Sequence, residues 1–229
     1  MIDYSKFLNN SIQEIKPSGI RKFFDIASEM DDVISLSIGE PDFQTPWHIR
    51  EEGINSLKNG KTWYSPNRGF AQLREEIANY YARRFNISYE GKTQVLVTVG
   101  GSEAIDLAFR CLVSEGDEVI IPEPSFVCYE PLTHMAGGKA VIINTKAEDQ
   151  FRLKADDLEK AITDKTKLVV LPFPNNPTGA IMEKADLEAI AEVIKKHDLF
   201  VLSDEIYSVL TYGGKNHISI ASVDGMYER

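Results

Sequence analysis

A glycine-containing turn is the first feature that could do chemistry. Gly100, Gly101, Ser102 and Glu103 follow a β-rich run and open a helical stretch. Glycines permit a tight turn, and the free N–H groups and positive dipole end of a helix can hold a phosphate. The spacing matches neither the dinucleotide-binding glycine pattern nor a P-loop, which would need a lysine. A plain glycine turn with a serine cap therefore stays an alternative.

Two later segments place an amide, a carboxylate and a phenol directly after β-rich runs. Asn176 lies in Pro-Asn-Asn-Pro-Thr-Gly, residues 174–179, where each proline restricts the residue before it and can fix a cis bond. The Asn176 amide, which both donates and accepts hydrogen bonds, is therefore expected at a rigid strand end. Asp204 ends an apolar run and is followed three residues later by Tyr207. A carboxylate there needs a cationic partner, or it serves as a helix cap.

The elements that must position these segments form an alternating pattern from about residue 94. The β-rich runs are 94–99, 117–122, 139–145, 167–173 and 199–204. The helical stretches between them are 101–113, 125–136, 155–163 and 183–198. This alternation predicts an α/β fold with a mostly parallel sheet covered by helices on both faces. Ligands of such sheets collect at the carboxyl ends of the strands, where the three segments lie.

The first 93 residues have a different pattern, which is mostly helical. An amphipathic helix is predicted after the turn at 65–69, with apolar positions Leu73, Ile77, Tyr80, Tyr81 and Phe85. No Gly/Ser linker separates this part from the sheet, so we expect it to pack against the sheet.

Composition narrows the class of protein and its partners. The 229 residues are 43% hydrophobic and 26% charged, as in ordinary globular chains, with a net charge of -10. No basic cluster stands apart, which disfavours nucleic acid and anionic membranes as partners. We expect neither a signal peptide nor a membrane-spanning run in this sequence. Cys111 and Cys128 are expected to be core residues in a reducing compartment. These features predict a cytoplasmic protein, and the four scattered histidines predict no metal site.

Together the three segments supply what pyridoxal phosphate (PLP) requires: phosphate donors, a fixed amide, and an acid near a phenol. On these residues the sequence resembles the class I/II aminotransferases of PLP fold type I, in the subgroup that acts on aspartate and aromatic amino acids. The pairing of Asn-Asn-Pro-Thr-Gly with Ser-Asp-Glu-Ile-Tyr, 28 residues apart from Asn176 to Asp204, is the most specific part of the resemblance. The segments 18–22 and 37–43 extend it toward the N-terminus.

The resemblance implies roles at the phosphate and on the ring face of the cofactor. Gly101, Ser102 and Glu103 match the phosphate-binding turn, with Glu103 acting through its backbone N–H only. Phe126 falls where the family places an aromatic ring stacked on the pyridine. Taken without the resemblance, Phe126 reads as a core residue.

The resemblance also implies roles at the ring edge. Asn176 and Tyr207 match the two groups that hydrogen-bond the ring 3-oxygen, and Asn176 is also expected near the substrate. Asp204 matches the partner of the pyridine nitrogen. Asp204 and Tyr207 are therefore the expected catalytic residues.

Two residues of the N-terminal part are implicated by the resemblance alone. Gly39 matches a glycine that approaches the substrate carboxylate, and the alternative is a simple turn before Pro41. Tyr64 matches a tyrosine that reaches the cofactor phosphate of the neighbouring subunit, which implies a homodimer with a shared active site. Its alternative is an ordinary half-buried aromatic residue.

One essential residue of the family has no match. The family holds PLP as a Schiff base on a lysine downstream of the aspartate, and the single lysine after Asp204, Lys215, lies in a different context and reads as a solvated loop residue. The resemblance also implies a C-terminal small domain, which we expect to be absent from this chain. We therefore expect 1–45 to be an N-terminal segment that contributes to the family's small domain, 46–229 to be a truncated large PLP-binding domain, and the isolated chain to be inactive.

The complete protein is expected to move an amino group between an amino acid and a 2-oxo acid. Two alternatives remain open. One is a PLP-dependent C–S lyase of the same fold, because fold and cofactor motifs do not determine the reaction. The other is a fragment that binds the cofactor without catalysis.

Overall fold

A computed structural model describes residues 2–15, 23, 26, 29, 30, 32–34, 39 and 42–229. The chain divides into two compact units, of which the larger comprises Met1–Ile15 and Arg68–Arg229 and the smaller comprises Lys16–Asn67. The expected domain boundary between residues 45 and 46 stays a prediction. Among the described residues, no helix is both long and apolar enough to cross a membrane.

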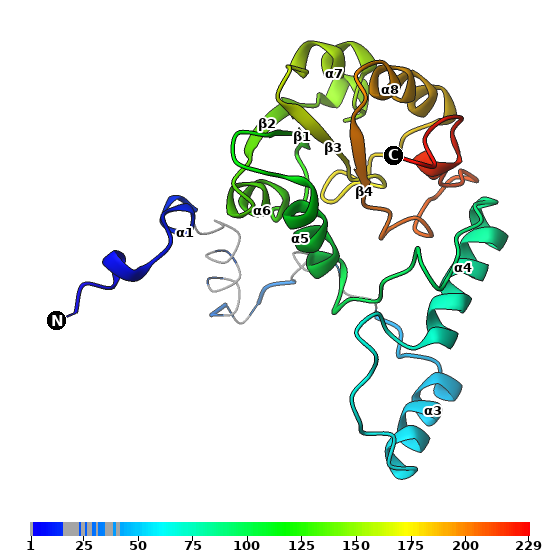
Figure 1. The fold of residues 1–229 in the computed structure, drawn as a ribbon. Helices are drawn as coiled ribbons and strands as arrows, with labels where there is room; N and C mark the ends of the chain where they lie inside the picture. The colour runs from blue at the N-terminus through cyan, green and yellow to red at the C-terminus, as the bar shows by residue number, and fades with distance from the viewer. Residues whose placement is uncertain are drawn as a thin grey trace. The chain divides into compact units, whose positions relative to one another are not determined.

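The larger unit is built on a four-stranded parallel sheet (Figure 1). Its strands are β1 (Glu118–Glu123), β2 (Lys139–Asn144), β3 (Thr166–Leu171) and β4 (Phe200–Ser203), in the order β2-β1-β3-β4. The register pairs Ile120 with Val141 on β2 and with Val169 on β3. The predicted fold class is confirmed, and four of the five β-rich runs are strands.

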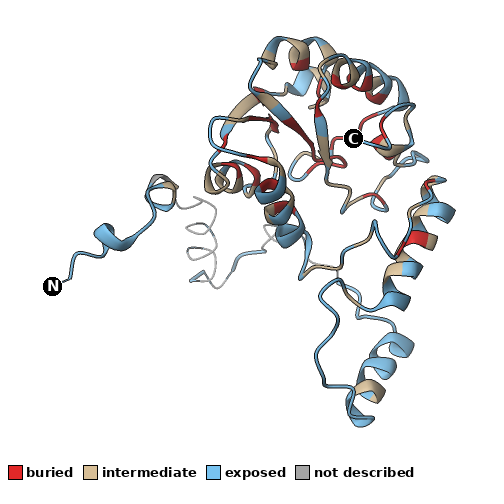
Figure 2. Cartoon of the chain, viewed as in Figure 1, coloured by how far each residue is buried: buried red, intermediate tan, exposed pale blue. Residues whose placement is uncertain are grey.

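Helices cover both faces of this sheet, as the alternating pattern predicts. One face carries α5 (Gly101–Leu112) and α6 (Tyr129–Met135), and the other carries α7 (Ala155–Ala161) and α8 (Lys184–Lys196) (Figure 1). Successive strand residues point to opposite faces, so Val119 and Ile121 pack with Phe109 of α5 while Ile120 packs with Ile190 of α8. Figure 2 shows the buried residues concentrated on the strands and on the helix faces turned toward them.

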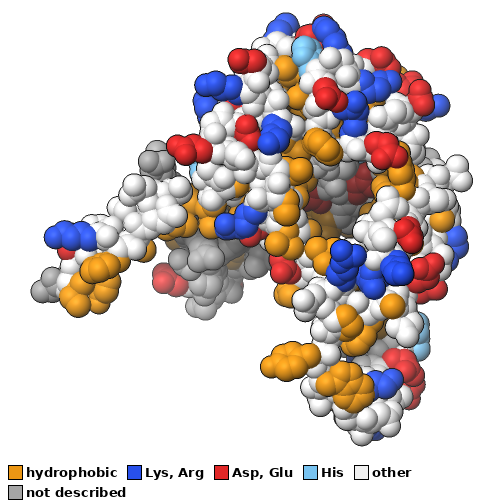
Figure 3. Space-filling model, in the orientation of Figure 1, with side chains coloured by type: hydrophobic (Ala, Val, Ile, Leu, Met, Phe, Trp, Pro, Cys, Tyr) orange, Lys and Arg blue, Asp and Glu red, His pale blue; other side chains and the backbone are white. Residues whose placement is uncertain are grey.

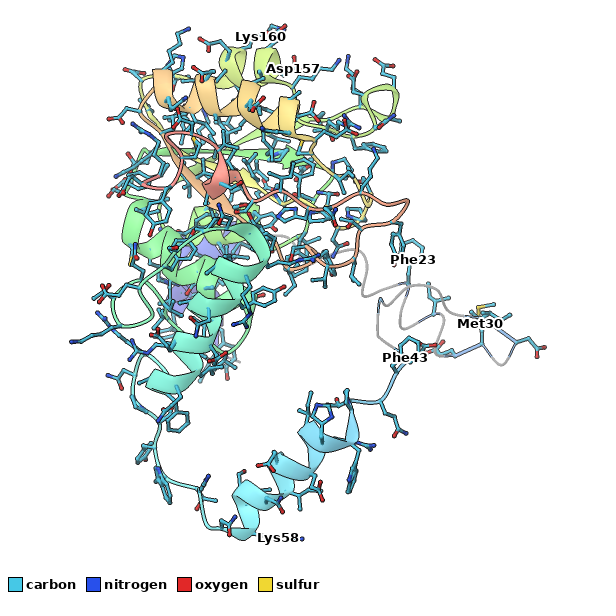
Figure 4. All side chains as sticks on the ribbon, turned by 90° about the vertical axis from the view of Figure 1, so that its right-hand side faces the viewer. Phe23, Met30, Phe43, Lys58, Asp157 and Lys160 are labelled. Atoms are coloured by element: carbon cyan, nitrogen blue, oxygen red, sulfur yellow. The ribbon has the colours of Figure 1, made fainter. Side chains whose placement is uncertain are left out.

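The outer helices show how local sequence sets their ends and faces. A capping box between Glu183 and Asp186 begins α8, and its apolar stripe, which includes Ile190, is buried. On α7, Asp157 and Lys160 point away from the sheet (Figure 4) and form an exposed ion pair of 3.4 Å. Acidic and basic side chains are interspersed over this unit on the face that Figure 3 shows.

The prediction of a strand at 94–99 is wrong. Residues 95–98 form no regular element, and Val99 is 93% exposed. A β-rich run becomes a strand only when a neighbouring strand takes up its backbone N–H and C=O groups. Here the Val97 N–H instead donates to the carbonyl of Arg68, a loop residue, at 3.2 Å.

The expectation that both cysteines are core residues is wrong for one of them. Cys111 lies on α5 and is exposed, because α5 buries the face that carries Ile105 and Phe109. Cys128 is half-buried and packs against the same apolar cluster as these two residues.

The predicted amphipathic helix is α4 (Ala71–Phe85), which follows the expected turn. Its C-terminal end meets the segment after β4, with the ring centroids of Phe85 and His217 5.8 Å apart. Just beyond it, Tyr89 stacks on Tyr227 at 5.4 Å. The remaining short elements of the unit are η1 (Tyr4–Phe7), α1 (Asn10–Glu14), η2 (Ala147–Asp149) and η3 (Ile220–Ser222).

The smaller unit contains α3 (Trp47–Lys58), with Lys58 at its end (Figure 4). The segment at 18–22 and residues 37, 38, 40 and 41 of the segment at 37–43 lie outside the described residues. The expectation that the N-terminal part packs against the sheet stays a prediction for this unit.

Candidate functional site

A pocket of about 200 Å³ lies at the carboxyl ends of β3 and β4. Six of the residues singled out in the sequence line it: Gly101, Ser102, Phe126, Asn176, Asp204 and Tyr207. They come from segments after three different strands and from the start of α5. The structure therefore brings the phosphate-type turn, the amide, the acid and the phenol to one place.

The glycine turn presents the start of α5 to this pocket. Gly100 has a φ of +91°, a backbone conformation that glycine adopts without strain. No described side chain caps the helix at this end, so its first N–H groups remain available to a ligand. The carboxylate of Glu103 accepts a hydrogen bond from the Val99 N–H and so ties the turn together. Glu103 is not among the residues lining the pocket, and its backbone role stays a prediction.

The turn after β3 is held by Asn175 rather than by Asn176. Asn175 is buried, and its Oδ1 accepts hydrogen bonds from the Thr178 hydroxyl at 2.8 Å and from the Thr178 N–H at 3.2 Å. The peptide bonds before Pro174 and Pro177 are cis. Asn176 is exposed and lines the pocket. The turn thus fixes the backbone that carries the Asn176 side chain.

Both carboxylate oxygens of Asp204 are hydrogen-bonded. The Asp204 N–H donates to the Leu171 carbonyl at 3.1 Å, which extends the β3–β4 ladder by one residue. Oδ1 accepts the Ile206 N–H at 3.2 Å, a local turn of the kind that the capping alternative describes. Oδ2 accepts the Tyr129 hydroxyl at 2.8 Å. Asp204 therefore makes the local capping contact and also lines the pocket.

Sequence reasoning did not single out Tyr129 as a site residue. It lies at the start of α6, is only 1% exposed, and lines the pocket. Burial, followed by the nearby Asp204 carboxylate, raises the pKa of Tyr129. Its ring meets Phe126 edge to face, with centroids 6.2 Å apart. The three-residue spacing between the two aromatic residues is the signal that could have indicated the pair.

The described residues that line this pocket do not include Gly39, Tyr64 or Lys215. Gly39 and Tyr64 belong to the smaller unit, and the Tyr64 side chain is fully exposed rather than half-buried. Their implied roles stay predictions. Lys215 places its Nζ 2.6 Å from a Glu183 carboxylate oxygen in a partly exposed ion pair, as a loop lysine would. Among the described residues, no lysine lines the pocket.

Comparisons with known proteins agree with this geometry. The family Aminotransferase class I and II matches residues 31–228. Two relatives align with 97% of this chain at 46% sequence identity. They are the aromatic-amino-acid aminotransferase 2 of Thermococcus litoralis and an aspartate aminotransferase of Pyrococcus abyssi. A single mutant of Thermus thermophilus aspartate aminotransferase superposes with a TM-score of 0.90 at 38% identity, over 95% of this chain.

The alignments cover nearly all of this chain but only part of each relative. The chain spans 57% of the length of each of these three proteins, a little more than half. The family match nevertheless covers most of the 229 residues and includes every residue that lines the pocket. The chain belongs to the class I and II aminotransferases.

Proposed function

We propose that these residues form the cofactor-binding part of a PLP-dependent aminotransferase that moves an amino group between an amino acid and a 2-oxo acid. The observation that carries the proposal is the convergence of the α5 start, Asn176, Asp204 and Tyr207 on one pocket. Family membership supplies the reaction class. The isolated chain is expected to be inactive, because none of the described lysines lines the pocket.

The charges and surfaces of the pocket fit PLP. The start of α5 offers unbonded N–H groups and the positive end of a helix dipole to a phosphate dianion. Asp204 offers a carboxylate held by two donors, which suits a protonated pyridine nitrogen. Phe126 offers a partly exposed aromatic face. When bound, PLP supplies an electron sink for the negative charge that develops on the substrate α-carbon.

Each residue of the pocket would then have a role set by its position around the cofactor. Gly101, Ser102 and the Glu103 backbone N–H bind phosphate, and Phe126 covers the ring face and excludes water from it. Asn176 and Tyr207 donate hydrogen bonds to the 3-oxygen. Asp204 keeps a proton on the ring nitrogen, because its negative charge favours the protonated form.

We also propose a homodimer with a shared site in the cytoplasm. The full exposure of Tyr64 suits a contact with a second copy of the chain, where it would reach the phosphate of the neighbouring site. Gly39 would lie near the substrate carboxylate. The two cysteines are free, which suits a reducing compartment. The relatives reported above are named aminotransferases, which favours amino-group transfer over C–S cleavage.

The test is the reaction of the complete protein. Glutamate formation from 2-oxoglutarate is measured with aspartate or an aromatic amino acid as donor, and pyruvate and ammonia are assayed separately. Asp204→Ala is expected to lower kcat by about 10³-fold, because the ring nitrogen loses its counter-charge. Asp157→Ala, which removes the exposed Lys160 ion pair on α7, serves as the control. Release of pyruvate and ammonia without glutamate, or near-native activity of Asp204→Ala, would contradict the proposal.

A further inference from the structure

The Asp204 carboxylate is held from two sides. The Ile206 N–H, in the turn that follows β4, donates to Oδ1, and the Tyr129 hydroxyl, on α6, donates to Oδ2. The terminal torsion of an aspartate is broad when nothing restrains it. Two donors at different oxygens define the plane of the carboxylate, and the Tyr129 contact joins positions 75 residues apart in the chain.

Tyr129 is itself rigid and retains its proton. Its ring is buried in the apolar cluster beneath α5 and α6, and the Thr133 hydroxyl donates to its carbonyl at 2.8 Å. Burial and the Asp204 charge raise the pKa of the phenol, so the hydroxyl stays protonated through the neutral range. It therefore acts as a donor, and Asp204 as the acceptor.

The ring of Tyr129 makes a second contact that the hydroxyl does not. It meets Phe126 edge to face, with an interplanar angle of 83°. One side chain thus touches both the carboxylate and the aromatic ring of the pocket wall. Tyr129→Phe removes the first contact and keeps the second, so the two effects are separable.

We propose that Tyr129 is a positioning residue whose hydroxyl holds the Asp204 carboxylate toward the cofactor's ring nitrogen, while its ring supports Phe126. The proposal rests on the proposed function. It predicts that the hydroxyl matters only for ligands that have a nitrogen for Asp204 to meet.

The test compares two ligands that differ at that single ring atom. Pyridoxamine 5′-phosphate carries no aldehyde and so does not react with surface lysines, and its 1-deaza analogue replaces the ring nitrogen with carbon. Calorimetric titration of the 229-residue chain gives both dissociation constants. Tyr129→Phe is expected to raise the dissociation constant of pyridoxamine 5′-phosphate by about tenfold and that of the analogue by less than about twofold. The reason is that a charge-assisted contact is lost only for the first ligand.

Two controls separate positioning from packing. Tyr227→Phe also removes a phenol hydroxyl, one that donates to the Ser88 carbonyl at 2.8 Å outside the pocket, and should leave both constants unchanged. In an Asp204→Ala background, Tyr129→Phe should cost nothing further, because its effect passes through Asp204. That double variant leaves neither partner unpaired, so it also tests the coupling if the single change impairs folding. Thermal unfolding checks each variant.

The possible results of these titrations separate failure of the positioning role from failure of the proposed function. Equal losses for both ligands, or native affinity in Tyr129→Phe, would overturn the positioning role and leave the proposed function standing. A further loss from Tyr129→Phe in the Asp204→Ala background would overturn it as well. Failure of the native chain to bind pyridoxamine 5′-phosphate would overturn the proposed function, and this inference with it.

Discussion

Replacing Glu118 with glutamine tests how the start of the sheet is held together. Glu118 begins β1 and is only 6% exposed. Its Oε1 accepts from the Lys139 ammonium on β2 at 3.1 Å, and its Oε2 accepts from the Thr163 hydroxyl before β3 at 2.7 Å. One carboxylate therefore ties together three neighbouring segments.

The size of the effect follows from these two contacts. Glutamine has nearly the same volume but a single acceptor oxygen, so it retains at most one of the two hydrogen bonds. A hydrogen bond to a charged group contributes about 1.5–3 kcal/mol. Lys139 and Thr163 are both exposed and regain water when released, which reduces the loss. The free energy of unfolding should fall by about 1.5 kcal/mol at pH 7.

The dependence on pH has a definite sign. The Thr163 hydroxyl, then Lys139, lower the pKa of Glu118 from its ordinary 4.5, although burial opposes them. A carboxyl with a depressed pKa in the folded state stabilises the fold above the pH at which it titrates when unfolded, and this contribution is lost as pH falls through the folded pKa. The difference in stability between the native chain and Glu118→Gln should therefore be full at pH 7 and shrink below about pH 4.5.

The assay is urea unfolding followed by circular dichroism at pH 7 and pH 4. Glu192→Gln is the matched control, because its side chain is 76% exposed and pairs with Lys195 on the surface of α8. Its effect should stay within about 0.5 kcal/mol. Equal stability of Glu118→Gln and the native chain at pH 7, or a difference that persists unchanged in acid, would refute the reasoning.

Two further changes probe the core and the turn beside the pocket. Phe109→Ala should lower the free energy of unfolding by about 3–5 kcal/mol, because the side chain is fully buried, whereas Leu107→Ala on the exposed side of α5 should cost much less in the same urea titration. Gly100→Ala should weaken binding of pyridoxamine 5′-phosphate by about tenfold, because a φ of +91° is strained for alanine by about 1–3 kcal/mol. Gly53→Ala, in the helix α3, should leave that affinity unchanged, and equal affinities for the two variants would contradict the role of the turn.

The strands were predictable where the sequence contains both partners of the ladder. Ile120 and Val169 lie in β-rich runs and pair with each other, so propensity and pairing agree. The run at 94–99 is also β-rich, yet the Val97 N–H bonds to a loop carbonyl. Propensity describes the chain locally, whereas a strand also needs a partner that composition does not identify.

The pocket residues were predictable for a topological reason. Parallel strands end at one edge of the sheet, so Asn176 and Asp204, each placed directly after a run, had to lie near each other. The residues that hold them were not predictable in this way. Asn175 was indistinguishable from its neighbour Asn176. Tyr129 lies 75 residues before Asp204, on a helix that packs on one face of the sheet, and no sequence spacing indicates their contact.

The pocket and the core beneath it are built from the same side chains. Ile105 and Tyr129 line the pocket and also belong to the apolar cluster that contains Phe109. A cavity at Phe109 therefore removes packing under both the α5 start and the Tyr129 ring. Because a ligand stabilises only the state that binds it, saturating pyridoxamine 5′-phosphate should restore part of the stability that Phe109→Ala loses. The ligand should raise the unfolding midpoints of both Phe109→Ala and the native chain. If the two chains also bind pyridoxamine 5′-phosphate with equal affinity, the pocket does not depend on this core.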